Sequence, residues 1–213
     1  MPELEIYWSF GSPYSYLAID RLIAIEKNYS VTVEFRPVRP LALRESDFFT
    51  RGRKQFLPYL VKDAAREAEQ LGVPFGFAVP HPVVIDFETG EVAPEQPMMT
   101  KVMGLAFAAI TLDRGLEFAQ TIGRSIWGGK VDWFQQEILQ QTLSSAGFNL
   151  TELSSWAADN QNAIDNTLAR NEKAQLEHHW GVPLMILDGE PFFGQDRLHA
   201  LLWRLDKLEL RQQ

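Results

Sequence analysis

The chain has 213 residues, 46% hydrophobic and 23% charged, so it can bury a substantial core as one domain or as one domain with a large insertion. Its 20 basic and 28 acidic residues give a net charge of −8, which excludes nucleic acid and anionic membranes as expected partners. No leader-like or membrane-spanning run is recognisable, so we expect a cytoplasmic protein. Because the chain has no cysteine, disulfides, thiolate metal sites and redox chemistry by its own sulfur are excluded.

The amino-terminal residues predict a βαβ unit with a short crossover. Residues 4–8 and 31–38 have the apolar and β-branched alternation of strands, and residues 13–27 between them read as a helix. The middle of the chain is predicted to be helical throughout. The expected helices are residues 58–71, 96–112, 116–127 and 132–146, the last with Asp132 as its cap.

The carboxy-terminal residues predict a helix, a hairpin and a final helix. Residues 163–180 form the first helix, which ends at Gly181, and Asp188-Gly189 is a strong hairpin signal between two short strands. Residues 195–208 form an amphipathic helix. Together with the first βαβ unit this is the element order of a thioredoxin fold. The predicted class is therefore α/β, a thioredoxin-like fold (1–42 and 160–213) with a large all-helical insertion (43–159).

The stretch "FGSPYSYL" places Ser12 between the first strand and the first helix. Ser12 is at the predicted N-cap position, which serine suits well, and Pro13 suits the first helical position, where no N–H is needed. A helix N-terminus also offers unpaired N–H groups and a partial positive charge, which stabilise an anion such as a thiolate. From the residues alone two interpretations stay open: Ser12 only caps the helix, or it also holds an anion.

The same stretch resembles the DsbA-like group of thioredoxin folds, with Ser12 and Ser15 at the positions of the two cysteines in the redox members. More closely, it resembles the 2-hydroxychromene-2-carboxylate isomerases and the kappa-class glutathione transferases. The segment "WGVPLMILDGEPFFGQDRL" is similar to the carboxy-terminal motifs of that family, and "SIWGGKVDWFQQEILQQTLSSAGF" is similar to the helical insertion of the isomerases.

The resemblance implies a glutathione site. Ser12 would hydrogen-bond the glutathione sulfur and keep it as thiolate. Pro183 would be the cis-proline of thioredoxin folds, and the backbone of Val182 would pair with the glutathione backbone like an added strand. Gln195 and Asp196 would meet the γ-glutamyl end, although an acidic residue in a first helical turn is also an ordinary structural feature.

The middle of the chain departs from the family pattern. The family's Asn before the helix at 58–71 is missing, and Lys54 lies about two positions from the family's Lys. Lys54 is either a ligand of the glycine carboxylate of glutathione or a solvated loop charge. The stretch "HPVVIDFETGEVAPEQP" is longer than in the family and reads as a hairpin that turns at Thr89-Gly90, which could border a second-substrate pocket.

The resulting hypothesis is a glutathione-dependent isomerase that acts on an aromatic or conjugated oxo-acid by reversible thiolate addition. The alternatives are a kappa-class-like glutathione transferase, which would release the conjugate, and a cysteine-less DsbA-like peptide-binding protein. No metal site is expected, since the adjacent His178 and His179 point about 100° apart on a helix. The expected partner is a small electrophilic substrate, and the resemblance also implies a possible homodimer.

Overall fold

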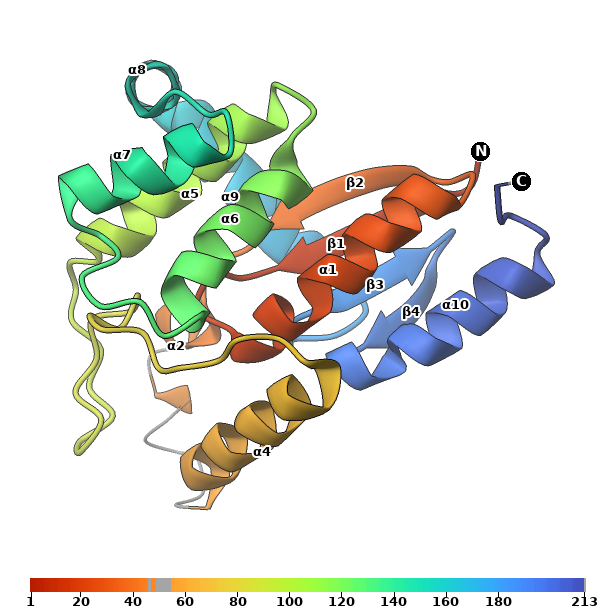
Figure 1. The fold of residues 1–213 in the computed structure, drawn as a ribbon, viewed down its shortest axis with the longest axis horizontal. Coiled ribbons are helices and arrows are strands. Elements are labelled where there is room, and N and C mark those ends of the chain that lie inside the picture. Colours follow the sequence, from red (N-terminus) through yellow and green to blue (C-terminus); the bar gives the residue numbers. More distant parts are fainter. Residues whose placement is uncertain (46, 49–54, 213) are drawn as a thin grey trace.

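The computed structural model describes residues 1–45, 47–48 and 55–212, with a four-stranded mixed sheet at the centre of the fold (Figure 1). The strand order is β2-β1-β3-β4. β1 pairs in parallel with β2 and antiparallel with β3, and β3 and β4 form an antiparallel hairpin. The strands are β1 (Glu3–Trp8), β2 (Thr32–Pro37), β3 (Leu184–Leu187) and β4 (Glu190–Phe193).

Both faces of the central strands are buried, because successive side chains of a strand point to opposite faces. Leu4, Ile6 and Trp8 of β1 belong to the main core with helices α1 (Pro13–Asn28) and α10 (Leu198–Lys207), which lie in front of the sheet in Figure 1. Tyr7 belongs to a smaller cluster on the other face, together with residues of β3 and α9. The sheet is therefore sandwiched between helices, as in other α/β domains.

Helix α9 (Gln161–Leu176) covers that second face, and a 3-10 turn, η1 (Gln195–Arg197), leads into α10. The predicted hairpin is confirmed: Asp188 and Gly189 join β3 to β4, both with positive φ. The positive φ suits the Asx-Gly pair, since glycine adopts this region without steric cost.

The helical block has two parts, and both contact α1 (Figure 1). Helices α5 (Pro97–Ile110), α6 (Gly115–Trp127), α7 (Gln136–Ser145) and α8 (Leu150–Asp159) pack on one another, whereas α4 (Phe56–Leu71) lies apart from them. One hydrophobic core runs through the block and the thioredoxin-like part. The predicted fold class is confirmed, while the division at residues 42 and 159 stays a prediction.

Several boundaries differ from the predicted ones. Asp132 does not cap a helix: it has a φ of 57°, its N–H bonds to the carbonyl of Val79, and α7 begins only at Gln136. The helix predicted to reach Trp180 ends at Leu176. α8 was not predicted, nor was the short helix α2 (Leu41–Arg44). Within the described ranges, no helix combines the length and apolar character that crossing a bilayer requires.

Candidate functional site

Ser12 is the N-cap of α1, as both interpretations require. Its backbone is extended, with φ −110° and ψ 117°, and its Oγ accepts a hydrogen bond from the N–H of Ser15 at 3.2 Å. A serine hydroxyl that accepts one hydrogen bond still has its own proton to donate. Capping and holding an anion are therefore compatible roles for this side chain.

Ser15, at the second cysteine position of the redox relatives, is placed differently. It is fully buried, and its Oγ lies 3.4 Å from the backbone N of Ser9. Ser12 is only half-buried and borders a cavity that Ser15 does not border. Of the two serines, only Ser12 can contact a ligand.

The cavity beside Ser12 has a volume of about 570 Å³, which is within the range of small-molecule sites. Its walls come from the start of α1, from α2 and α4, from the loop between α4 and α5, and from the segment before β3. The residues that line it are predominantly apolar and aromatic. They include Ser12, Tyr14, Arg44, Phe48, Phe56, His81, Val83, Ile85, Phe87, Trp127, Trp180, Val182 and Phe193.

Aromatic rings form one side of this cavity. The rings of Phe48 and Phe56 meet edge to face at 5.8 Å, and Phe48 also lies 5.8 Å from Trp180. Trp180 is 45% exposed and lies 6.1 Å from Phe193. Partly exposed rings on a cavity wall suit a flat, apolar ligand, because stacking adds to the burial of apolar area.

Arg44 brings a positive charge into this apolar cavity. Its Nη1 donates to Oε1 of Gln175 at 3.0 Å and its Nη2 donates to the carbonyl of Trp180 at 3.1 Å. Burial lowers the pKa of Arg44, although an arginine remains charged. In the part of the chain that the structure describes, no carboxylate forms an ion pair with Arg44. The guanidinium can therefore accept an anionic partner.

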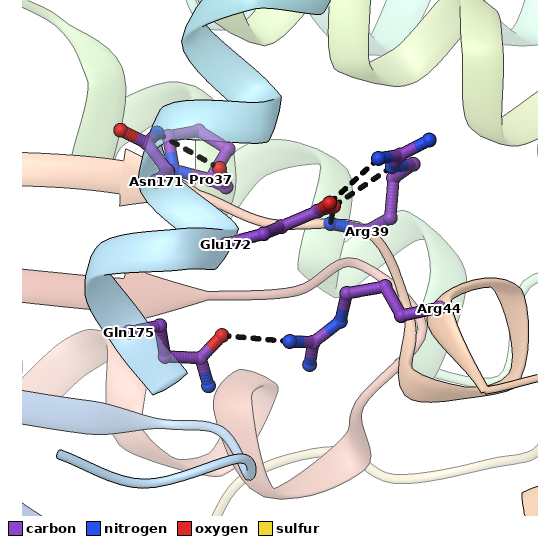
Figure 2. A network of polar contacts seen from close by, with 6 residues as sticks. All are labelled: Pro37, Arg39, Arg44, Asn171, Glu172 and Gln175. Carbon is purple, nitrogen blue, oxygen red and sulfur yellow. Dashed lines mark hydrogen bonds and ion pairs between the residues drawn. The ribbon is translucent and has the colours of Figure 1, made fainter. Parts of the chain in front are cut away.

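Helix α9 holds the segment that carries Arg44 (Figure 2). Arg39 forms a bidentate pair with the buried Glu172, with distances of 2.8 and 2.6 Å. Asn171 donates to the carbonyl of Pro37, and Gln175 donates to the carbonyl of Gly181 at 2.7 Å while it accepts from Arg44. This network connects α2 to the segment before β3 and so fixes two walls of the cavity relative to each other.

Val182 and Pro183 lie where the resemblance places them. The Val182–Pro183 peptide bond is cis, as expected. Val182 lines the cavity, and among the described residues no hydrogen bond to its N–H or C=O is found. An unpaired, cavity-lining backbone of this kind can add a strand-like ligand.

Gln195 and Asp196 do not line the Ser12 cavity. Gln195 is 4% exposed, and its side chain joins two charged residues: its Oε1 accepts from Arg21 and its Nε2 donates to Glu67 at 2.8 Å. Asp196 is exposed, and its carboxylate lies 3.1 Å from Arg197. Lys54 lies outside the described residues.

His81 is a cavity residue that the sequence analysis did not propose. It lies between two prolines in the loop after α4, and burial lowers its pKa below the usual value for histidine. The rings of Phe87 and Trp127 lie 5.0 and 6.0 Å from it. No local signal marks this position, since Trp127 comes from a helix more than forty residues away. Within the described ranges, no cluster of three or more metal-binding side chains is present.

The predicted loop at Thr89-Gly90 does border the cavity. A single antiparallel bridge joins Ile85 to Val92, and Gly90 has a φ of 77° at the turn. Ile85 and Phe87 line the Ser12 cavity from this loop, and Phe87 is 56% exposed. The longer loop therefore contributes apolar surface beside the serine.

The fold and the cis-proline define a thioredoxin-like protein. Residues 3–206 match the DSBA-like thioredoxin domain, so the chain belongs to that family. It is 23% identical to a 2-hydroxychromene-2-carboxylate isomerase of Pseudomonas putida, over 93% of this chain and 91% of the relative. It is also 23% identical to an isomerase of the same name from Sphingobium xenophagum, over 93% of this chain and 95% of the relative.

Solved structures give the same picture of the fold. A 2-hydroxychromene-2-carboxylate isomerase structure superposes with a TM-score of 0.70 at 21% identity, covering 97% of this chain and 95% of its own. The structure of the cytosolic disulfide reductase DsbM from Pseudomonas aeruginosa with GSH has a TM-score of 0.58 at 15% identity, covering 96% and 99%. At these identities the structures establish the fold of the chain.

Proposed function

We propose that this protein is a glutathione-dependent isomerase of an aromatic or conjugated oxo-acid. The observation that carries the proposal is the position of Ser12: a hydroxyl with a proton to donate, at the N-terminus of α1, beside a cavity, in a chain without cysteine. A hydroxyl donor and a helix N-terminus both favour an anion, and a thiolate supplied by glutathione is the anion that suits this place.

The reaction uses the sulfur as a reversible nucleophile. The thiolate adds to an electrophilic carbon conjugated with a carbonyl, so that the double bond becomes single and the substrate can rotate about it. Elimination of the thiolate then leaves the new isomer and returns glutathione unchanged. The protein holds the thiolate, positions the substrate and stabilises the enolate that forms between the two steps.

The cavity supports an aromatic acid as the substrate. Its rings, such as Phe48 and Trp180, offer stacking surfaces for a flat ligand. Arg44 offers a guanidinium without a carboxylate partner in the described chain, and arginine binds a carboxylate through charge-assisted hydrogen bonds. The isomerase relatives are named for 2-hydroxychromene-2-carboxylate, which is both aromatic and acidic. That compound is the first substrate to test.

The backbone of Val182 supports glutathione as the cofactor. A tripeptide can pair with the unpaired backbone of the residue next to the cis-proline. The DsbM structure with GSH supports the same idea from a protein of this fold. Gln195 is a weaker candidate, because its side chain already bridges Arg21 and Glu67. Asp196, which is exposed, is then the residue that would meet the γ-glutamyl end of glutathione.

Isothermal titration with glutathione tests the proposal, with the wild-type protein and the variants Ser12→Ala and Ser15→Ala side by side. We expect the wild type and Ser15→Ala to bind and Ser12→Ala to bind more weakly. The same proteins are then assayed with 2-hydroxychromene-2-carboxylate, with and without glutathione. If the wild type neither binds glutathione nor needs it for turnover, the proposal is wrong.

A glutathione transferase would use the same thiolate and the same cavity. The two differ in the fate of the adduct: a transferase releases it as a conjugate, whereas the isomerase eliminates glutathione from it. Mass spectrometry of separate reactions with a chlorinated aromatic compound and with 2-hydroxychromene-2-carboxylate distinguishes the two: a stable conjugate in the first indicates a transferase, and an isomerised acid with unchanged glutathione in the second indicates the isomerase. A peptide-binding protein would bind extended peptides at Val182 and would turn over neither compound.

A further inference from the structure

His81 is held in one orientation beside the cavity. Its Nδ1 lies 2.9 Å from the carbonyl oxygen of Val83 and 3.3 Å from the N–H of the same residue. The shorter contact is the one to the carbonyl, which assigns the proton of the neutral ring to Nδ1. Nε2 is then an unprotonated acceptor, and it makes no hydrogen bond within the part of the chain that the structure describes.

Two contacts place His81 next to the residues before Ser12. A Cβ added at Gly11 would lie 3.3 Å from Cγ2 of Val83, so the side chain of the residue whose backbone holds the histidine lies next to Gly11. On the other side, the His81 ring lies 6.0 Å from Trp127, whose indole N–H donates to the carbonyl of Phe10 at 3.0 Å. The histidine and the serine are therefore tied to the same short segment and line the same cavity.

The surroundings of the ring keep it neutral. Phe87 and Trp127 pack against it with their rings near perpendicular, and desolvation lowers its pKa. The other titratable groups that line the cavity in the described chain are Tyr14 and Arg44. The hydroxyl of Tyr14 donates to Asp63 at 2.7 Å, and Arg44 is a cation that would oppose a second positive charge. An imidazolium formed here gives up its proton readily.

We propose that His81 is the proton carrier of the isomerisation, a role that rests on the function proposed above. As the S–H bond of glutathione breaks, its proton moves to Nε2, and Ser12 stabilises the sulfur anion that is left. The S–C bond forms, the C=C π pair moves to the bond beside the carbonyl carbon, the carbonyl π pair moves to oxygen, and Nε2 gives its proton to that oxygen. After rotation the enol proton returns to Nε2, the C=C and C=O bonds re-form, and the S–C bond breaks. The thiol then regains its proton, so no oxidant or reductant is needed.

The variant His81→Asn tests this role. An asparagine amide can keep the hydrogen bond to Val83 but has nothing at the position of Nε2. We expect kcat/KM for 2-hydroxychromene-2-carboxylate to fall roughly 100-fold or more, as for the loss of a general acid–base group. Glutathione affinity measured by titration should stay within about twofold of the wild type, because the binding of glutathione does not use this proton transfer. His178→Asn, at an exposed position after α9, is the matched control and should behave as the wild type.

A pH profile adds a readout that a purely structural histidine would not change. The neutral ring is the active form, so the wild-type rate should fall with acidity at a pH below about 6.5, the usual pKa of histidine. This histidine titration should be absent in His81→Asn, whose acidic limb then follows the titration of the glutathione thiol alone. His81→Gln, which brings an amide close to the position of Nε2 but cannot titrate, should also lack it and is used in the same way if His81→Asn does not fold.

The proposal is overturned if His81→Asn or His81→Gln retains a kcat/KM within about threefold of the wild type with the acidic limb unchanged. It is also overturned if the variants lose glutathione binding and activity in parallel, since the role is then structural. Absence of glutathione-dependent turnover in the wild type itself contradicts the proposed function, and the two failures are thus distinguishable.

Discussion

The two ends of the expected glutathione site differ in how free their side chains are. At the sulfur end, Ser12 uses its oxygen as a helix cap and keeps a proton to donate toward a cavity. At the γ-glutamyl end, Gln195 has both ends of its amide engaged by Arg21 and Glu67, and Asp196 is exposed beside Arg197. Residues that the resemblance assigns to one ligand site can thus have different surroundings in the folded chain.

From this difference we expect variants at the first end to affect ligand binding and variants at the second end to affect stability as well. A buried amide that bridges a cation and a carboxylate leaves both partners unsatisfied when it is removed. A serine cap that faces a cavity contributes about 1 kcal/mol to stability, whatever its chemical role. Variants at the two ends should therefore separate effects on activity from effects on the free energy of unfolding.

Ser12→Ala should have the largest effect, and on activity. Removal of one hydrogen-bond donor from a developing or bound anion lowers kcat by roughly 100- to 1000-fold. The lost cap should lower the free energy of unfolding by only about 1 kcal/mol. Steady-state kinetics and urea unfolding of Ser12→Ala and Ser15→Ala check this. Equal activity losses in the two variants would contradict a special role for Ser12.

Arg44→Met should weaken the binding of the acidic substrate more than the chemical step. Loss of charge-assisted hydrogen bonds of about 1.5–3 kcal/mol corresponds to a rise in KM of roughly 10- to 100-fold. Arg44→Lys is the matched variant and should retain part of the affinity, since it keeps the charge without the planar fork. An unchanged KM in Arg44→Met would remove Arg44 as the carboxylate ligand.

Gln195→Ala should affect stability first. Arg21 and Glu67 then lose a shared partner in a partly buried place, so the free energy of unfolding should fall by about 1–3 kcal/mol. Arg197→Ala, at an exposed position next to it, should change stability little. Chemical denaturation of both variants measures the difference. A stable Gln195→Ala that has lost glutathione binding would show instead that the amide serves the ligand.

Asp196→Asn should have the smallest effect. Its ion pair with Arg197 is exposed, so stability should be unchanged within error. If Asp196 meets the amino group of glutathione, titration should show an affinity lower by a few-fold, as for an exposed ion pair. An affinity for glutathione equal to that of the wild type would show that Asp196 does not bind the γ-glutamyl end.

The fold was largely predictable because its signals are local. The strand at β1, the start of α1 at Ser12-Pro13 and the turn at Asp188-Gly189 all follow from patterns within a few residues. Helix α8 also has a local start signal, since Asn149 accepts from the N–H groups of Thr151 and Glu152. Asn149 and Glu152 have the spacing of a capping box.

The site was predictable only where the motif itself provides the chemistry. Ser12 and the cis bond before Pro183 follow from their motifs, and the cavity beside Ser12 contains both Ser12 and Val182. His81 and Arg44 depend on tertiary contacts: the first is desolvated between Phe87 and Trp127, and the second is oriented by Gln175. The inward orientation of Gln195 likewise depends on Arg21 and Glu67, which no local pattern connects to it.

The pKa of the bound glutathione thiol tests the central claim most directly. The ultraviolet absorbance of the thiolate, followed as a function of pH in the complex with the wild-type protein, reports this value. The account predicts a pKa clearly below the usual value of about 8.5 for a thiol, and a return toward that value in Ser12→Ala. A thiol that titrates in the complex as it does in free solution would contradict the account.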